Sequence, residues 1–163
     1  MLLEPTKQKL RKLKLIGMLE SLEQQMELQE VEKLSFEDRL GLLLDQEILK
    51  KENQKVYRLL KQAGLKQDAC IEDLEFPATR KLSKQMILSL ASCQWIKQGH
   101  NLMITGATGT GKTYLACALG KEACHKGFSV KYSRPSRLFP ELFISRGDGS
   151  YLRKLEKIGR AHV

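Results

Sequence analysis

Apolar residues recur every three or four positions through the first 64 residues, and this spacing predicts amphipathic helices. One helix is expected over residues 6–30, and a second is expected from Ser35 to Gly64. Ser35 and Asp38 have the spacing of a capping box, in which both side chains satisfy N–H groups at the start of a helix. Residues 1–66 are therefore predicted to form a helical N-terminal domain.

The pattern changes after residue 66. Periodicity is lost over residues 67–82, which are predicted to be a linker, and Ser83 can cap a further helix over 84–98. Short apolar runs at 102–104 and 128–132 then predict strands on either side of a helix. Further helices are expected over 136–145 and 152–157. Strand, loop, helix and strand open an α/β nucleotide-binding fold, so the predicted fold class is α/β, with a helical N-terminal region before it.

The loop between the first strand and its helix fits the phosphate-binding pattern G-x-x-x-x-G-K-[ST]. Its eight residues are Gly106, Ala107, Thr108, Gly109, Thr110, Gly111, Lys112 and Thr113. The glycines allow backbone N–H groups to point at a polyphosphate, and the following helix adds its positive end. Lys112 would reach the β- and γ-phosphates, and Thr113 would bind Mg²⁺. The alternative is a glycine-rich turn beside a surface lysine.

Charge favours an acidic partner such as nucleic acid or an anionic surface. The chain has 28 Lys and Arg against 19 Asp and Glu, a formal net charge of +9. Lys51, Lys55 and Arg58 follow one another at helical spacing and are candidate DNA contacts. A solvated helix face is the alternative for this row. The same two readings apply to the basic cluster between Lys7 and Lys14.

No other ligand class has a sequence signal. The four cysteines lack the spacing of zinc ligands or of a disulfide framework, and no apolar run approaches the length of a membrane span. The first residues also lack the order of a signal peptide. A cytoplasmic protein with no membrane partner is expected.

The stretches LASCQWI at 90–96, NLMIT at 101–105 and YLACALG at 114–120 surround the phosphate loop. Together with QDAC at 67–70, Arg137-Leu138 and DGSY at 148–151, they resemble the IstB-like ATP-binding proteins, helper ATPases of insertion-sequence transposition. Such proteins are similar to helicase loaders of the DnaC type within the AAA+ class. The resemblance covers nearly the whole chain. It implies that ATP and Mg²⁺ are the cofactors, that the full-length protein forms a homo-oligomer on DNA, and that a transposase is its partner.

The resemblance also implies that the AAA+ core is incomplete. No apolar strand that ends in paired acidic residues follows residue 113, and the polar sensor and arginine finger of the class are missing. Residues 83–157 are thus expected to be the N-terminal part of an AAA+ domain that does not hydrolyse ATP by itself. Residues 158–163 match a translated sequencing adapter and are expected to be an artefactual tail.

Three functions are compatible with these features. The first is an ATP-binding helper of DNA transposition that assembles on DNA and recruits or stimulates a transposase. The second is a DnaC-like loader of a replicative helicase. The third is a small P-loop kinase, against which the basic N-terminal helices argue.

Overall fold

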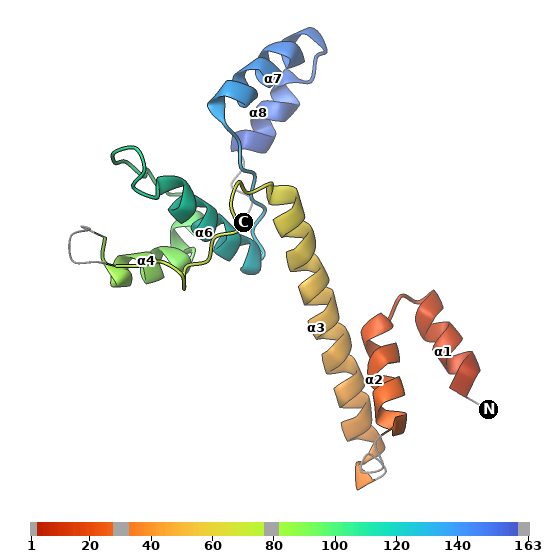
Figure 1. Ribbon diagram of the computed structural model, residues 1–163. Helices are drawn as coiled ribbons and strands as arrows, with labels where there is room; N and C mark the ends of the chain where they lie inside the picture. The colour runs from red at the N-terminus through yellow and green to blue at the C-terminus, as the bar shows by residue number, and fades with distance from the viewer. Residues whose placement is uncertain (1–2, 28–32, 77–81, 160–163) are drawn as a thin grey trace. The chain divides into compact units, whose positions relative to one another are not determined.

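A computed structural model describes residues 3–27, 33–76 and 82–159 of the chain, and these residues form eight helices (Figure 1). The chain divides into two compact units, Met1–Tyr57 and Arg58–Val163. The predicted domain boundaries at 66 and 82 stay a prediction. Residues 77–81 of the expected linker, and 160–163 of the expected tail, lie outside the described residues.

The first unit contains α1 (Leu3–Lys12), α2 (Ile16–Glu27) and most of α3 (Phe36–Ala63). The single helix expected over residues 6–30 is wrong, because the chain turns between α1 and α2; residues 28–30 are outside the described range. Lys14 adopts a left-handed conformation with φ 57°, and the N–H of Leu15 donates to the Leu10 carbonyl at 2.9 Å. A residue in the left-handed conformation commonly ends a helix, and that residue is usually glycine. Because the residue here is a lysine, the sequence does not indicate that a helix ends at this position.

Both predicted ends of α3 are confirmed. The N–H of Asp38 donates to the Ser35 hydroxyl at 3.1 Å, and Gly64 follows the helix with φ +58°. Although α3 has 28 residues, charged side chains recur along it. Among the helices described here, none is both long and apolar enough to cross a membrane.

A buried carboxylate joins α2 to α3. Glu47 of α3 accepts a hydrogen bond from the N–H of Met18 at 3.1 Å and pairs with Lys51 at 3.3 Å. Burial opposes ionisation, but the bonds from Met18, Lys51 and Gly17 outweigh it and lower the pKa of Glu47. The two helices are close here, since a Cβ at Gly17 would lie 2.6 Å from the Cα of Glu47. Glu47 therefore caps the first turn of α2 from a neighbouring helix.

The second unit contains α4 (Lys84–Ala91), α5 (Gln94–Lys97), α6 (Lys112–His125), α7 (Pro135–Gly147) and α8 (Tyr151–Gly159). Ser83 caps α4 as predicted, accepting from the N–H of Met86 at 3.2 Å. The single helix expected over 84–98 is wrong. Buried Cys93, at φ 59°, separates α4 from α5, and a cysteine in a left-handed conformation has no sequence signature.

The predicted α/β fold class is wrong for this chain, because the described residues contain no strand. Residues 102–104 and 128–132 have no ladder of hydrogen bonds to a neighbour, and a strand requires one. The side-chain alternation of a strand persists at 128–132, where Phe128, Val130 and Tyr132 are half-buried and the residues between them exposed. The apolar pattern therefore identified the side of each segment that packs on the core. It did not show whether a neighbouring strand was present for backbone hydrogen bonding.

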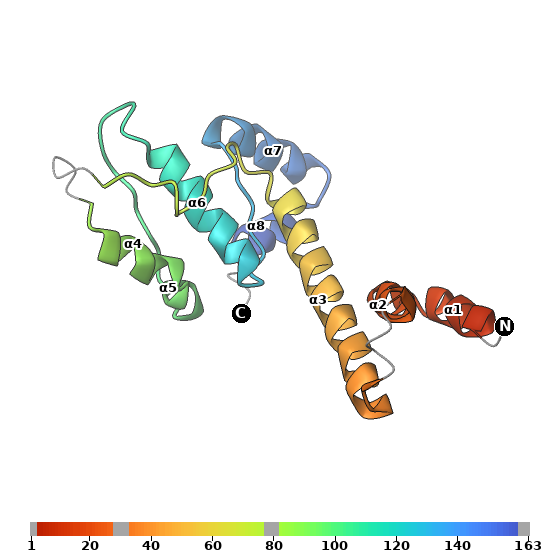
Figure 2. The same cartoon turned by 60° about the horizontal axis from the view of Figure 1, so that its bottom comes forward.

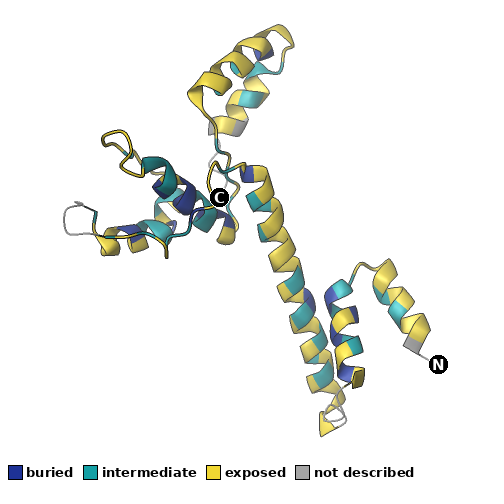
Figure 3. Ribbon diagram, in the orientation of Figure 1, coloured by how far each residue is buried: buried dark blue, intermediate teal, exposed yellow. Residues whose placement is uncertain are grey.

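The core of the second unit lies around α6. One cluster consists of Ala69, Cys117 and Ala118, and the other of Ile87, Leu115 and Leu119. Burial is concentrated on α6 (Figure 3). Helix α4 packs beside α6 (Figure 2). The phosphate-loop helix is thus the best-buried element of its unit.

Gly17→Ala should destabilise the first unit, because the new methyl group would meet the α3 backbone at Glu47 and Gln46. Overpacking of this kind costs about 1–3 kcal/mol. The matched control is Gly41→Ala in α3, where a Cβ meets nothing within 4 Å. That change should stabilise the helix by roughly 0.5–1 kcal/mol. Urea unfolding followed by circular dichroism measures both, and equal shifts in the two variants would contradict the close approach.

Amide hydrogens of residues 102–104 should exchange quickly, whereas those in the middle of α6 should exchange slowly. The first group has no ladder partner, and the second is bonded within a buried helix. Hydrogen exchange followed by mass spectrometry, with overlapping peptides from each segment, separates the two. Strong protection at 102–104 would restore the sheet that the sequence predicted.

Candidate nucleotide-binding site

The predicted phosphate loop connects an extended segment to α6. Its three glycines, Gly106, Gly109 and Gly111, have φ values of 155°, 83° and 84°. Residues with a Cβ rarely adopt these conformations, so the structure accounts for glycine at each position. Gly111 is the N-cap of α6 and Lys112 its first residue. The loop therefore delivers the chain directly to the positive end of the helix.

Lys112 folds back over the loop. Its Nζ donates to the carbonyl oxygens of Gly106 at 2.8 Å and Ala107 at 2.6 Å. The Thr110 hydroxyl also donates to Ala107, at 2.9 Å, and a Cβ at Gly106 would approach that hydroxyl to 3.2 Å. These contacts bring the ammonium group and the helix N-terminus to the same small loop.

Electrostatics at the loop favour an anion. The first turn of α6 contains no acidic side chain, and its first N–H groups have no partners within the helix. Residues 105–111 are exposed, whereas Lys112 and Thr113 are half-buried. A phosphate could thus reach the loop from solvent and meet the helix dipole and one ammonium group.

The helix that supports the loop is held by packing on two sides. Ile87 of α4 and half-buried Ile104 pack against Leu115 and Leu119. Six of its residues are buried, namely Leu115, Cys117, Ala118, Leu119, Ala123 and Cys124. Cys117 and Cys124 are among them, and the surface they meet in the described residues is not a sheet.

Residues 65–71 dock on the other side of α6. Ala69 is fully buried against Cys117 and Ala118, and the N–H of Cys70 donates to the Tyr114 hydroxyl at 3.4 Å. Lys121 donates to the Asp68 carboxylate at 2.6 Å and to the Cys70 sulfur at 3.1 Å. This docked segment, residues 65–71, lies partly in the predicted linker. Sequence reasoning missed it, because no local pattern connects positions about fifty residues apart.

The Lys121 contacts change the acidity of the groups involved. The hydrogen bond from Lys121 lowers the pKa of Asp68, and the same bond raises the pKa of Lys121. Asp68 is largely exposed, so water weakens the attraction between the two charges. The pair fixes the position of residues 65–71 more than it stabilises the unit.

The candidate DNA contacts all lie on α3 and are exposed. Lys51 is engaged with Glu47 at 3.3 Å. Lys51 and Lys55 belong to the first unit, and Arg58 belongs to the second. Their role in DNA binding stays a prediction, as do the nucleotide-binding roles of residues 106–113.

Residues 8–163 match the family described as IstB-like ATP binding protein. A relative from Pseudomonas fluorescens, whose name places it in insertion sequence IS1162 as an ATP-binding protein, is 46% identical over the whole chain and 71% of its own length. A Sinorhizobium fredii relative with a similar insertion-sequence name is 37% identical over the whole chain and 66% of its length. One from Mycobacterium tuberculosis is 30% identical over 91% of the chain and 59% of its length.

The alignments extend well beyond the phosphate loop, because the first two relatives match across the helical N-terminal unit as well. The chain spans 66–71% of the length of those two relatives, which are longer proteins. A family match over most of the chain, together with 46% identity to one relative, settles the relationship. The chain belongs to the family of IstB-like ATP-binding proteins.

Proposed function

We propose that the chain binds ATP at residues 106–113. The observation that carries this proposal is the position of Lys112, whose Nζ lies over the loop at the N-terminus of a buried 14-residue helix. An incoming phosphate would replace loop carbonyls as the partner of the ammonium group and gain charge-assisted hydrogen bonds. The names of the relatives, which describe ATP-binding proteins, favour ATP over other polyphosphates.

The loop also fits a nucleotide-bound Mg²⁺ ion. Thr113 follows Lys112 in the first turn of α6, where its hydroxyl is the hard oxygen ligand that Mg²⁺ prefers. When bound with the nucleotide, the ion would neutralise part of the phosphate charge. Paired acidic residues at the end of an apolar strand would complete such a site, and none follows the loop in this sequence. We therefore propose that this chain binds ATP but does not hydrolyse it by itself.

For the longer protein, we propose a helper role in DNA transposition. In this role, ATP binding promotes assembly of a homo-oligomer on DNA, and the assembly recruits or stimulates a transposase. The insertion-sequence names of the relatives support transposition over helicase loading. They also argue against a small-molecule kinase.

Lys112→Ala should weaken ATP binding by roughly 10- to 100-fold, because hydrogen bonds to charged groups contribute about 1.5–3 kcal/mol. Isothermal titration with ATP and Mg²⁺ measures the change. Lys97→Ala is the matched control, since Lys97 is an exposed lysine at the end of α5, outside the loop. Equal ATP affinity in the two variants would exclude the loop as the binding site.

Transposition should require the same lysine. A cell-based assay would combine the transposase of the same insertion sequence with the longer protein, either wild type or carrying Lys112→Ala. We expect the variant to reduce transposition to the level seen without the helper. Wild-type frequency with Lys112→Ala, at equal protein abundance, would remove ATP binding from the proposed role.

A further inference from the structure

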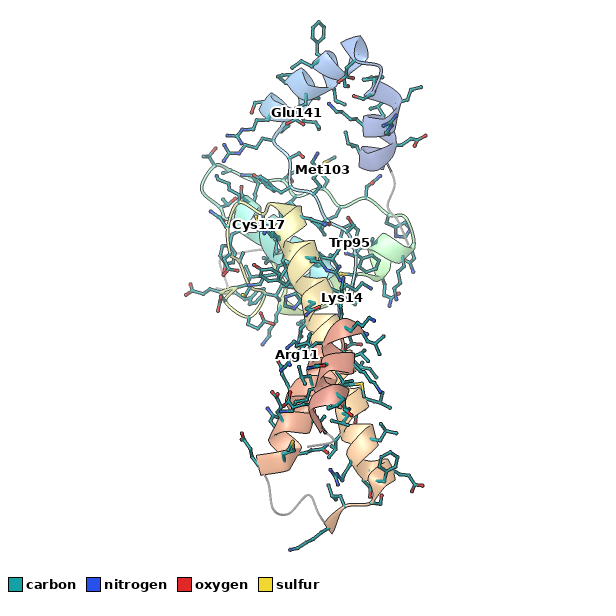
Figure 4. The ribbon with its side chains drawn as sticks, turned by 90° about the vertical axis from the view of Figure 1, so that its right-hand side faces the viewer. Arg11, Lys14, Trp95, Met103, Cys117 and Glu141 are labelled. Carbon is teal, nitrogen blue, oxygen red and sulfur yellow. The ribbon has the colours of Figure 1, made fainter. Side chains whose placement is uncertain are left out.

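A second cationic site lies in the C-terminal unit, away from the phosphate loop in sequence. A pocket of about 350 Å³ is lined by Gly64 and Lys66, which follow α3, by the segment 131–134 and by the first turns of α7. Its lining includes four cationic side chains, Lys66, Lys131, Arg134 and Arg137. Glu141, which Figure 4 labels on α7, is the one acidic residue among the described residues of that lining. None of the lining residues belongs to the loop at 106–113.

The four cations are not neutralised within the described part of the chain. Elsewhere, Lys7, Lys50 and Lys121 each pair with a carboxylate, as do Lys51 of α3 and Lys126, which follows α6. None of the four pocket cations pairs with a described acidic residue in this way. Like charges held around one pocket repel each other, and an anion between them relieves that repulsion.

Backbone contacts hold the charged segments in place. The N–H of Tyr132 donates to the Ala63 carbonyl at 2.8 Å, which fixes residues 131–134 beside the end of α3. Arg134 is the N-cap of α7, a 13-residue helix whose first turn contains no acidic residue and no side-chain cap. The partial positive charge of this helix end therefore adds to the four side chains.

We propose that this pocket, with Lys66, Lys131, Arg134 and Arg137, holds a backbone phosphate of nucleic acid. The four cations are exposed, and one exposed ion pair contributes only about 0.2–1 kcal/mol, so a single free phosphate would bind weakly. A polymer of phosphates gains in addition from release of its condensed counterions. The inference rests on the proposed DNA-handling function. It gives a role in that function to four residues that the sequence alone did not identify as a group.

The test compares two double variants of the 163-residue chain, whose affinity for a fluorescein-labelled DNA duplex is measured by anisotropy over a series of salt concentrations. Arg134→Gln with Arg137→Gln removes two charges from the pocket. Because each neutralised phosphate contributes about 0.9 to the salt slope, loss of the one phosphate held by the pocket should lower that slope by about 1. Lys97→Gln with Lys126→Gln removes the same charge outside the pocket and should leave the slope near the wild-type value.

The possible outcomes separate this inference from the function on which it rests. A reduced slope in the arginine variant alone supports the pocket. Equal slopes in the two variants, with wild-type DNA binding intact, overturn the pocket and leave the DNA function standing. Absence of DNA binding by the wild-type chain overturns the pocket, whereas the DNA function, which is proposed for the longer protein, is tested separately by the transposition assay. Binding of inorganic phosphate as tight as that of the duplex would overturn the preference for a polymer.

Discussion

Burial of α6 is the interaction on which the rest of the C-terminal unit depends. The helix presents one side to Ile87 and Ile104 and another to Ala69, and its own small residues, including Ala118 and Gly120, allow close contact. Its N-terminus is also where the loop glycines and Lys112 meet. The helix with the most buried residues among the described helices of its unit therefore also orients the candidate phosphate site.

The same helix explains why this unit retains strand-like features without strands. Segments 102–104 and 128–132 pack one side against the core, but a sheet also requires neighbours in the hydrogen-bonding direction. Ile104 is half-buried against the core, whereas the side chain of Met103 is 85% exposed. The apolar face of each segment packs against helices, but no ladder of backbone hydrogen bonds joins either segment to another described segment.

Positive charge in this protein occurs in two arrangements. Where a lysine is paired, as Lys51 is with Glu47 or Lys121 with Asp68, it connects elements and contributes to architecture. Lys112 at the phosphate loop and the four cations of the pocket around Arg134 and Arg137 form no ion pair with a carboxylate among the described residues. The second arrangement is the one expected of surfaces that receive phosphate, because an unpaired charge keeps its full attraction for a ligand.

The sequence by itself determined the features that depend on local chemistry. The caps at Ser35 and Ser83, the helix end at Gly64 and the glycine pattern of the loop each follow from residues a few positions apart. Tertiary structure decided what depends on distant partners. The docking of Ala69 on α6 and the absence of strands among the described residues reflect neighbours that no periodic pattern encodes. The left-handed turns at Lys14 and Cys93 occur at residue types that give no sequence signal for them. A strand pattern specifies which face is apolar, but hydrogen-bonded pairing requires a second strand, and its presence is a property of the folded chain.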